Sequence, residues 1–79
     1  MEVKERIINL LSDKLGYAAT EIKEENNFIT DLSADSLDMV EIIMGIEQEF
    51  GLKIDDNEIS EVKTVGDLIK KVNDIRMGR

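Results

Sequence analysis

The chain has 79 residues and contains no cysteine, histidine or proline, so it holds one domain without disulfides, thiolate metal ligands or the commonest general base. Acidic residues outnumber basic ones 18 to 10, and the net charge of −8 opposes binding to nucleic acid or to anionic lipid surfaces. Because no apolar run approaches the ~20 residues that span a bilayer, we expect a cytoplasmic protein with no membrane insertion and a single domain over residues 1–79.

The negative charge is concentrated in one stretch of the sequence. No Lys or Arg occurs between Lys23 and Lys53, and the gap contains eight acids: Glu24, Glu25, Asp31, Asp35, Asp38, Glu41, Glu47 and Glu49. The other ten acids are balanced by the ten bases, so the whole net charge falls in this gap. Such a run is either a solvated face or an electrostatic docking surface for basic partners.

The first segment predicts an amphipathic helix that ends at Gly16. Its apolar residues recur at spacings of three and four: Val3, Ile7, Ile8, Leu11 and Leu15. Residues 17–34 have no sustained period and predict a loop, which is long for so small a domain and therefore a candidate functional segment. Four apolar side chains are expected to pin this loop to the core: Ile22, Phe28, Ile29 and Leu32.

A second helix is predicted to begin at Asp35 or Ser36, either of which can cap it, and to end at Gly51. Its core stripe consists of Met39, Ile43, Ile46 and Phe50, with Ile42 on the flank. Leu37 and Met44 lie about 140° from that stripe, on a face that should be wet. Scattered surface apolar residues are ordinary, but beside Ser36 and among acids these two indicate a contact patch.

The rest of the chain predicts one short and one long helix. Residues 55–62 support at most a short helix, and the last helix begins at Thr64, with Asp67 completing a capping box. The apolar stripe of the last helix is Val65, Leu68, Ile69, Val72 and Ile75. The fold is therefore predicted to be an all-α four-helix bundle with three longer helices, one short third helix and a long loop between helices one and two.

No catalytic or metal-binding constellation is evident in the sequence. Serine hydrolysis needs a nearby base, and the acidic gap contains neither His nor Lys. A calcium loop beginning at Asp31 fails, because the turn position is Ser36 rather than Gly and the closing position is Ile42 rather than Glu. Ser36 is thus either an ordinary helix cap or a serine displayed for modification by another enzyme.

The run from Asp31 to Glu41, DLSADSLDMVE, closely resembles the phosphopantetheine attachment site of acyl carrier proteins. The resemblance extends over essentially the whole chain, at Leu15-Gly16, at Phe28, at residues 47–50 and at residues 63–67. It implies that a phosphopantetheinyl transferase, using coenzyme A and magnesium, attaches 4′-phosphopantetheine to Ser36, with Asp35 close to the metal. The arm would carry acyl groups as thioesters, and the chain would be a carrier and not an enzyme.

The resemblance also implies roles for the surrounding side chains, in a protein expected to be a monomer. Fatty acid synthase enzymes and acyltransferases with basic surfaces would dock on Asp35, Leu37, Asp38, Val40, Glu41, Met44 and Glu47. The acyl chain would fold back against Met39, Ile43, Ile46, Ile54, Ile59 and Leu68.

Three residues depart from the family pattern, and the pathway stays open. Many relatives have Gly where Ser33 stands, Pro where Asp55 stands and Ala where Gly45 stands. Gly45 is expected to let helix two flex or let a partner approach closely. The leading hypothesis is a carrier for fatty acid synthesis. The alternatives are a specialised carrier for polyketide, nonribosomal peptide or another dedicated pathway, and an unmodified acidic interaction module in which Ser36 is only a cap.

Overall fold

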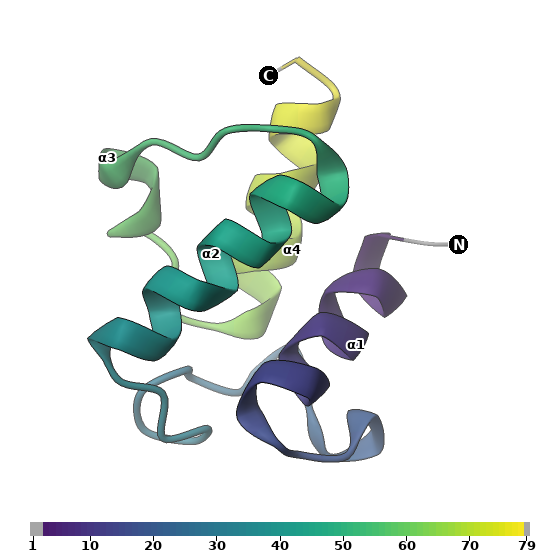
Figure 1. Ribbon diagram of the computed structural model, residues 1–79, viewed down its shortest axis with the longest axis vertical. Coiled ribbons are helices and arrows are strands. Elements are labelled where there is room, and N and C mark those ends of the chain that lie inside the picture. The colour runs from purple at the N-terminus through teal and green to yellow at the C-terminus, as the bar shows by residue number, and fades with distance from the viewer. Residues whose placement is uncertain (1–2, 79) are drawn as a thin grey trace.

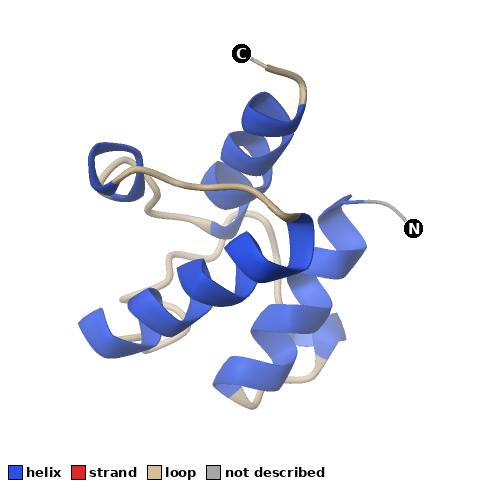
Figure 2. Cartoon of the chain, turned by 45° about the horizontal axis from the view of Figure 1, so that its top comes forward, coloured by secondary structure: helices blue, strands red, loops and turns tan. Residues whose placement is uncertain are grey.

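The computed structural model describes residues 3–78 and contains four α-helices in that range (Figure 1). They are α1 (Val3–Leu15), α2 (Ser36–Phe50), α3 (Asp56–Ile59) and α4 (Val65–Arg76), and a short 3₁₀ turn, η1 (Ala19–Glu21), interrupts the long loop. Figure 2 shows helices and loops without a strand over the described residues. The predicted all-α fold, with three longer helices and a short third one, is confirmed. No helix in this range is long and apolar enough to cross a membrane.

The helix ends confirm the stop and cap signals of the sequence. Gly16 ends α1 with φ +81°, and its N–H donates to the Ser12 carbonyl at 2.9 Å. Gly51 ends α2 in the left-handed conformation, at φ +65°. At the start of α2, Asp35 is the cap, because its Oδ1 accepts the Asp38 N–H at 2.8 Å and Asp38 Oδ2 accepts the Asp35 N–H at 3.2 Å.

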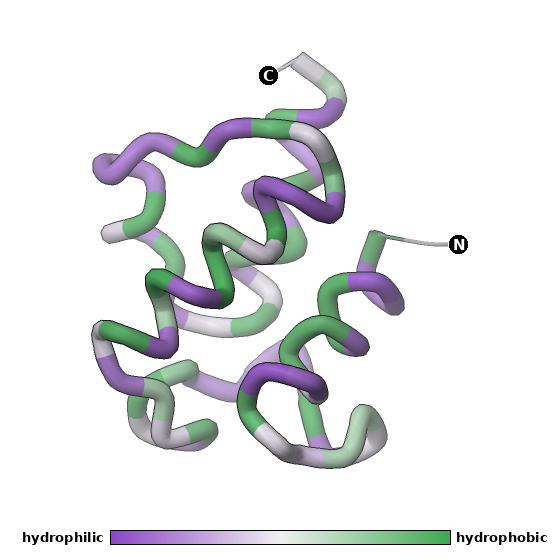
Figure 3. The backbone as a smooth tube through the Cα atoms, in the orientation of Figure 1, coloured by the Kyte–Doolittle hydropathy of each residue, from purple (hydrophilic) through white to green (hydrophobic). Residues whose placement is uncertain are grey.

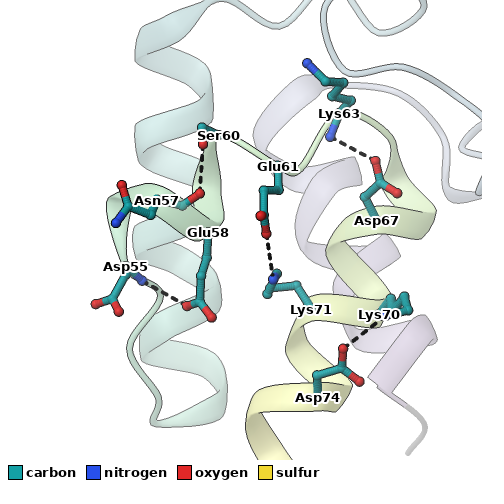
Figure 4. Close-up of polar contacts among 10 residues, drawn as sticks. All are labelled: Asp55, Asn57, Glu58, Ser60, Glu61, Lys63, Asp67, Lys70, Lys71 and Asp74. Atoms are coloured by element: carbon teal, nitrogen blue, oxygen red, sulfur yellow. Dashed lines mark hydrogen bonds and ion pairs between the residues drawn. The ribbon is translucent and has the colours of Figure 1, made fainter. Parts of the chain in front are cut away.

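A second capping box begins α4, and Figure 4 shows the hydrogen bond between Lys63 and Asp67 beside it. Thr64 Oγ1 accepts the Asp67 N–H at 3.1 Å, and Asp67 Oδ2 accepts the N–H groups of Lys63 and Thr64, both at 3.1 Å. These two backbone donors hold the pKa of Asp67 below its ordinary value of 3.8. Stability from this carboxylate is therefore present above that value and is lost as the pH falls through the lowered pKa.

One core joins the helices and the loop. Helix α1 packs against α2 and α4, and Figure 3 shows hydrophobic and hydrophilic positions alternating along each of the long helices. The buried side chains are Ile7, Leu11, Ile22, Phe28, Leu32, Ala34, Ile42, Ile43, Ile46, Ile54, Val62, Val65, Leu68, Ile69 and Val72. The stripe on α2 is centred differently from the prediction, because Ile42 is fully buried whereas Met39 and Phe50 are only partly buried.

The long loop is fixed to the start of α4 by backbone hydrogen bonds. Asn27 and Thr64 form an isolated antiparallel bridge. The Phe28 N–H donates to the Lys63 carbonyl at 3.0 Å, and the Val65 N–H donates to the Asn26 carbonyl at 3.0 Å. Phe28 itself is only 1% exposed, as expected for a side chain that pins the loop. The prediction for Ile29 is wrong, since 58% of its surface is exposed.

The expectation that Gly45 lets a partner approach closely is wrong. A Cβ at this position would lie 3.2 Å from Leu10 Cδ1 and 3.6 Å from Lys14 Cε, so Gly45 faces α1 and not an outside partner. The glycine lets the two helices approach closely. The second departure, Asp55, replaces the rigidity of a proline with a hydrogen bond that proline cannot make, from its N–H to Glu58 Oε2 at 3.3 Å (Figure 4).

Ser33 is strained, which generates a prediction. Its φ is +57°, and this turn brings the Ala34 N–H to the Phe28 carbonyl at 2.8 Å. A non-glycine residue in the left-handed conformation costs about 1–2 kcal/mol. Glycine avoids this strain, but the greater freedom of its unfolded chain reduces the gain in stability by about 0.5–1 kcal/mol. We therefore expect Ser33→Gly to raise the free energy of unfolding by about 0.5–1 kcal/mol, measured by urea denaturation.

Ser33→Ala is the matched control, because alanine keeps the strained Cβ and should bring no gain. Equal stabilisation by both substitutions would show that the side chain, and not the backbone, sets the cost.

Candidate functional site

Ser36 is the first residue of α2 and is exposed to solvent. Because Asp35 provides the cap, the Ser36 hydroxyl is not needed to begin the helix. The long loop leads directly into Ser36, and Figure 1 shows the loop passing beside the first turn of α2. The arrangement displays one hydroxyl at the junction of a loop and a helix.

Ser36 also lies at the edge of a cavity of about 770 Å³. The lining comes from the loop, from α2, from the segment that leads into α3 and from α3 itself. It consists of Ile29, Ser36, Met39, Val40, Ile43, Met44, Glu47, Lys53, Ile54, Asp55, Asp56 and Ile59. The walls are therefore mainly apolar, with charged groups around Lys53, Asp55 and Asp56.

The cavity contains part of the predicted acyl pocket. Met39, Ile43, Ile54 and Ile59 line it. Ile46 and Leu68 do not line it, and both are fully buried in the core. Sequence reasoning missed Ile29, Lys53, Asp55 and Asp56 as lining residues. The signal for Ile29 was Asn27, whose side chain builds the turn that exposes it.

The predicted partner surface is largely exposed. Leu37, Val40 and Met44 have 67%, 53% and 52% of their surface exposed. Val40 and Met44 also line the cavity, so they belong to both the outer face and the cavity wall.

The carboxylates predicted for this surface differ in what they do. Asp35 and Asp38 cap α2, and Glu47 Oε2 accepts the Ile54 N–H at 2.9 Å, which ties α2 to the segment before α3. Glu41 is exposed. Most of these acids therefore shape the site as well as charge it.

The acidic gap is partly compensated by α1, which corrects the prediction of eight uncompensated acids. Lys4 Nζ lies 2.8 Å from Glu24 Oε2, and Arg6 Nη2 lies 2.7 Å from Glu49 Oε2. The Arg6 guanidinium also stacks on the Phe50 ring, 4.5 Å from its centroid. The six other acids, Glu25, Asp31, Asp35, Asp38, Glu41 and Glu47, leave the negative charge on the loop and on α2, where Glu47 alone among them lines the cavity.

The comparisons with known proteins agree on one family. Residues 5–72 match the family profile described as a phosphopantetheine attachment site. The acyl carrier protein of Clostridium acetobutylicum is 47% identical over 70 residues, or 89% of this chain and 91% of that one. The acyl carrier protein of Porphyromonas gingivalis is 48% identical over 68 residues, or 86% and 87% of the two chains.

A solved structure from Mycobacterium tuberculosis, itself provisionally assigned as an acyl carrier protein, has the same fold. Its TM-score is 0.84 at 27% identity, over 91% of this chain and 96% of that one. A helical carrier domain that accepts phosphopantetheine is thus the class of protein that the fold and the comparisons define. The chain belongs to the acyl carrier protein family, whose members are carriers and not enzymes and hold a covalent phosphopantetheine group.

The concentration of acids on the loop and α2 predicts a response to salt. Raising the ionic strength from about 0.01 M to 0.15 M shortens the screening length from about 30 Å to 8 Å, so we expect the melting temperature to rise. Glu41→Gln should raise the melting temperature at low salt and have little effect at high salt.

Glu61→Gln is the matched control, because Glu61 pairs with Lys71 at 3.2 Å and should lose a weak attraction instead of a repulsion. A melting temperature that stays flat or falls with salt would contradict the account of the charge.

Proposed function

We propose that this chain carries fatty acyl groups as thioesters on a 4′-phosphopantetheine arm attached to Ser36, for fatty acid biosynthesis. The proposal is supported above all by the placement of Ser36, whose exposed hydroxyl borders an apolar cavity. The residues fit the group, since an arm joined to this hydroxyl has a path both to solvent and into the cavity. When bound, the arm supplies the thiol that the chain lacks.

The attachment needs a separate transferase. Ser36 Oγ forms a bond to the phosphorus that bears the pantetheine of coenzyme A, adenosine 3′,5′-bisphosphate leaves, and the hydroxyl proton passes to a base of the transferase. Asp35, the exposed residue before Ser36, is proposed to lie close to the magnesium ion of that enzyme. The acidic residues of the loop and α2 suit a transferase or acyltransferase with a basic surface.

The cavity gives the cargo a place away from water. Burial of each methylene group stabilises an apolar chain by about 0.8 kcal/mol, and Met39, Ile43, Ile54 and Ile59 provide apolar walls. We therefore assign the acyl pocket to these four residues and not to Ile46 and Leu68, which do not line the cavity. The outer face of α2, with Leu37, Val40 and Met44, is the proposed docking surface for the partner enzymes.

Attachment at Ser36 is tested by intact mass. After incubation with coenzyme A, magnesium and a broad-specificity phosphopantetheinyl transferase, the bare chain should gain one phosphopantetheine. Ser36→Ala should gain none and should melt at nearly the same temperature, because Ser36 is exposed and Asp35 provides the cap.

Ser33→Ala is the matched control for that experiment, being a second exposed serine in the same segment, and it should load normally. A bare chain that stays bare, or loading that persists in Ser36→Ala, would refute the assignment.

The pathway is tested by giving the loaded chain to reconstituted fatty acid synthesis enzymes. Successive two-carbon mass increments support the proposed pathway, and their absence favours the specialised carrier.

A further inference from the structure

Ile29 is an exposed apolar residue held in a rigid position. With 58% of its surface exposed, it follows Phe28, which is only 1% exposed. Asn27 Oδ1 accepts the N–H groups of Ile29 at 2.8 Å and Thr30 at 3.1 Å. The Asn27 N–H donates to Asp31 Oδ2 at 2.7 Å, which closes the turn. A loop with this many local hydrogen bonds holds its backbone in one conformation, so the exposure of Ile29 is built into the turn.

The side chain of Ile29 lines the same cavity as Ser36. Every other lining residue comes from α2 or from the segment 53–59, so Ile29 is the contribution of the long loop to the cavity wall. Figure 1 and Figure 2 both show this loop beside the N-terminal end of α2, which begins at Ser36. The cavity that Ser36 borders therefore has an apolar lining residue supplied by a hydrogen-bonded turn of the loop.

We infer that Ile29 is a positioning residue that packs against the pantoyl part of the arm on Ser36, and this inference rests on the proposed attachment. The pantoyl group follows the phosphate and bears two methyl groups on one carbon, so it is the first apolar part of the arm. The charged residues that flank Ser36 in the sequence, Asp35 and Asp38, are negative and form no ion pair with a phosphodiester. The pantoyl methyl groups carry no charge, so their attraction to the cavity wall is an apolar contact, which Ile29 offers.

A partner enzyme is the competing occupant of the Ile29 surface. Leu37 distinguishes the two cases, because it is 67% exposed beside Ser36 but does not line the cavity. A residue that serves only the docking surface is expected to be exposed but to lie outside the cavity, as Leu37 does. Ile29, which shares the cavity with the attachment serine, has the placement of a residue that meets the arm itself.

The test is nuclear magnetic resonance of the loaded full chain with labelled isoleucine methyl groups, after intact mass has confirmed loading. We expect nuclear Overhauser cross-peaks between the pantoyl methyl protons and the Ile29 δ1 methyl, and a shift of that methyl between the bare and the loaded chain. In Ile29→Ser the pantoyl methyl shifts should move to those of free pantetheine. In Leu37→Ser, the matched control, they should stay in place.

Two results would overturn the inference. A loaded chain without the cross-peaks, or with pantoyl shifts that Ile29→Ser leaves unchanged, would show that Ile29 does not hold the arm, even where transfer to a partner enzyme slows. A chain that takes up no arm would overturn the proposed attachment and this inference with it. Because Ile29 is exposed, Ile29→Ser should melt close to the parent chain, which separates a local effect from unfolding.

Discussion

The burial of Phe28, which the long loop contributes to the core, is the contact on which the rest of the structure depends. Closing a loop of 18 residues costs about 2.5 kcal/mol of chain entropy, and burying one phenylalanine returns about 1.5–3 kcal/mol. The backbone bonds from Phe28 to Lys63 and from Val65 to Asn26 satisfy the polar groups that this burial would otherwise strand. The fixed loop then returns through Ser33 and Ala34 to Asp35, which caps α2 and leaves Ser36 outside.

Helix α2 divides two tasks between its faces. Ile42 and Ile46 are fully buried and hold the helix in the core, and Gly45 lets it approach α1 closely. Another side presents Ser36 and the cavity walls, where apolar surface is left open for a cargo. The acids of the loop and α2 repel one another, which costs stability, but they give basic partners an attractive surface. Stability and function therefore depend on different residues of α2, so the amino acids of the outer face can vary while those of the core stay the same.

Local signals predicted the helices well, and long-range packing explains what they missed. Caps such as Asp35 and stops such as Gly51 act through neighbouring backbone groups, so their chemistry can be recognised from sequence. A loop without a period gives no rule for which apolar residue turns inward, and Phe28 and Ile29 therefore looked alike. The side of α2 on which the cavity lies depends on the segment 53–59, so the sequence could not separate pocket residues from core residues such as Ile46. The pairing of Arg6 with Glu49 joins residues 43 positions apart, which no local pattern specifies.

Amide hydrogen exchange of the Phe28, Ala34, Val65 and Gly66 N–H groups tests this account most directly. The Phe28 N–H donates to the Lys63 carbonyl at 3.0 Å. The N–H groups of Ala34, Val65 and Gly66 donate to carbonyls of the long loop at 2.8–3.0 Å. If the loop is anchored as the structure indicates, these four amides exchange only through global unfolding, with protection equal to that of Leu11 and Ile46 in the core. Exchange at the rate of an open loop, while the core amides stay protected, would contradict the claim that this anchor sets the position of Ser36.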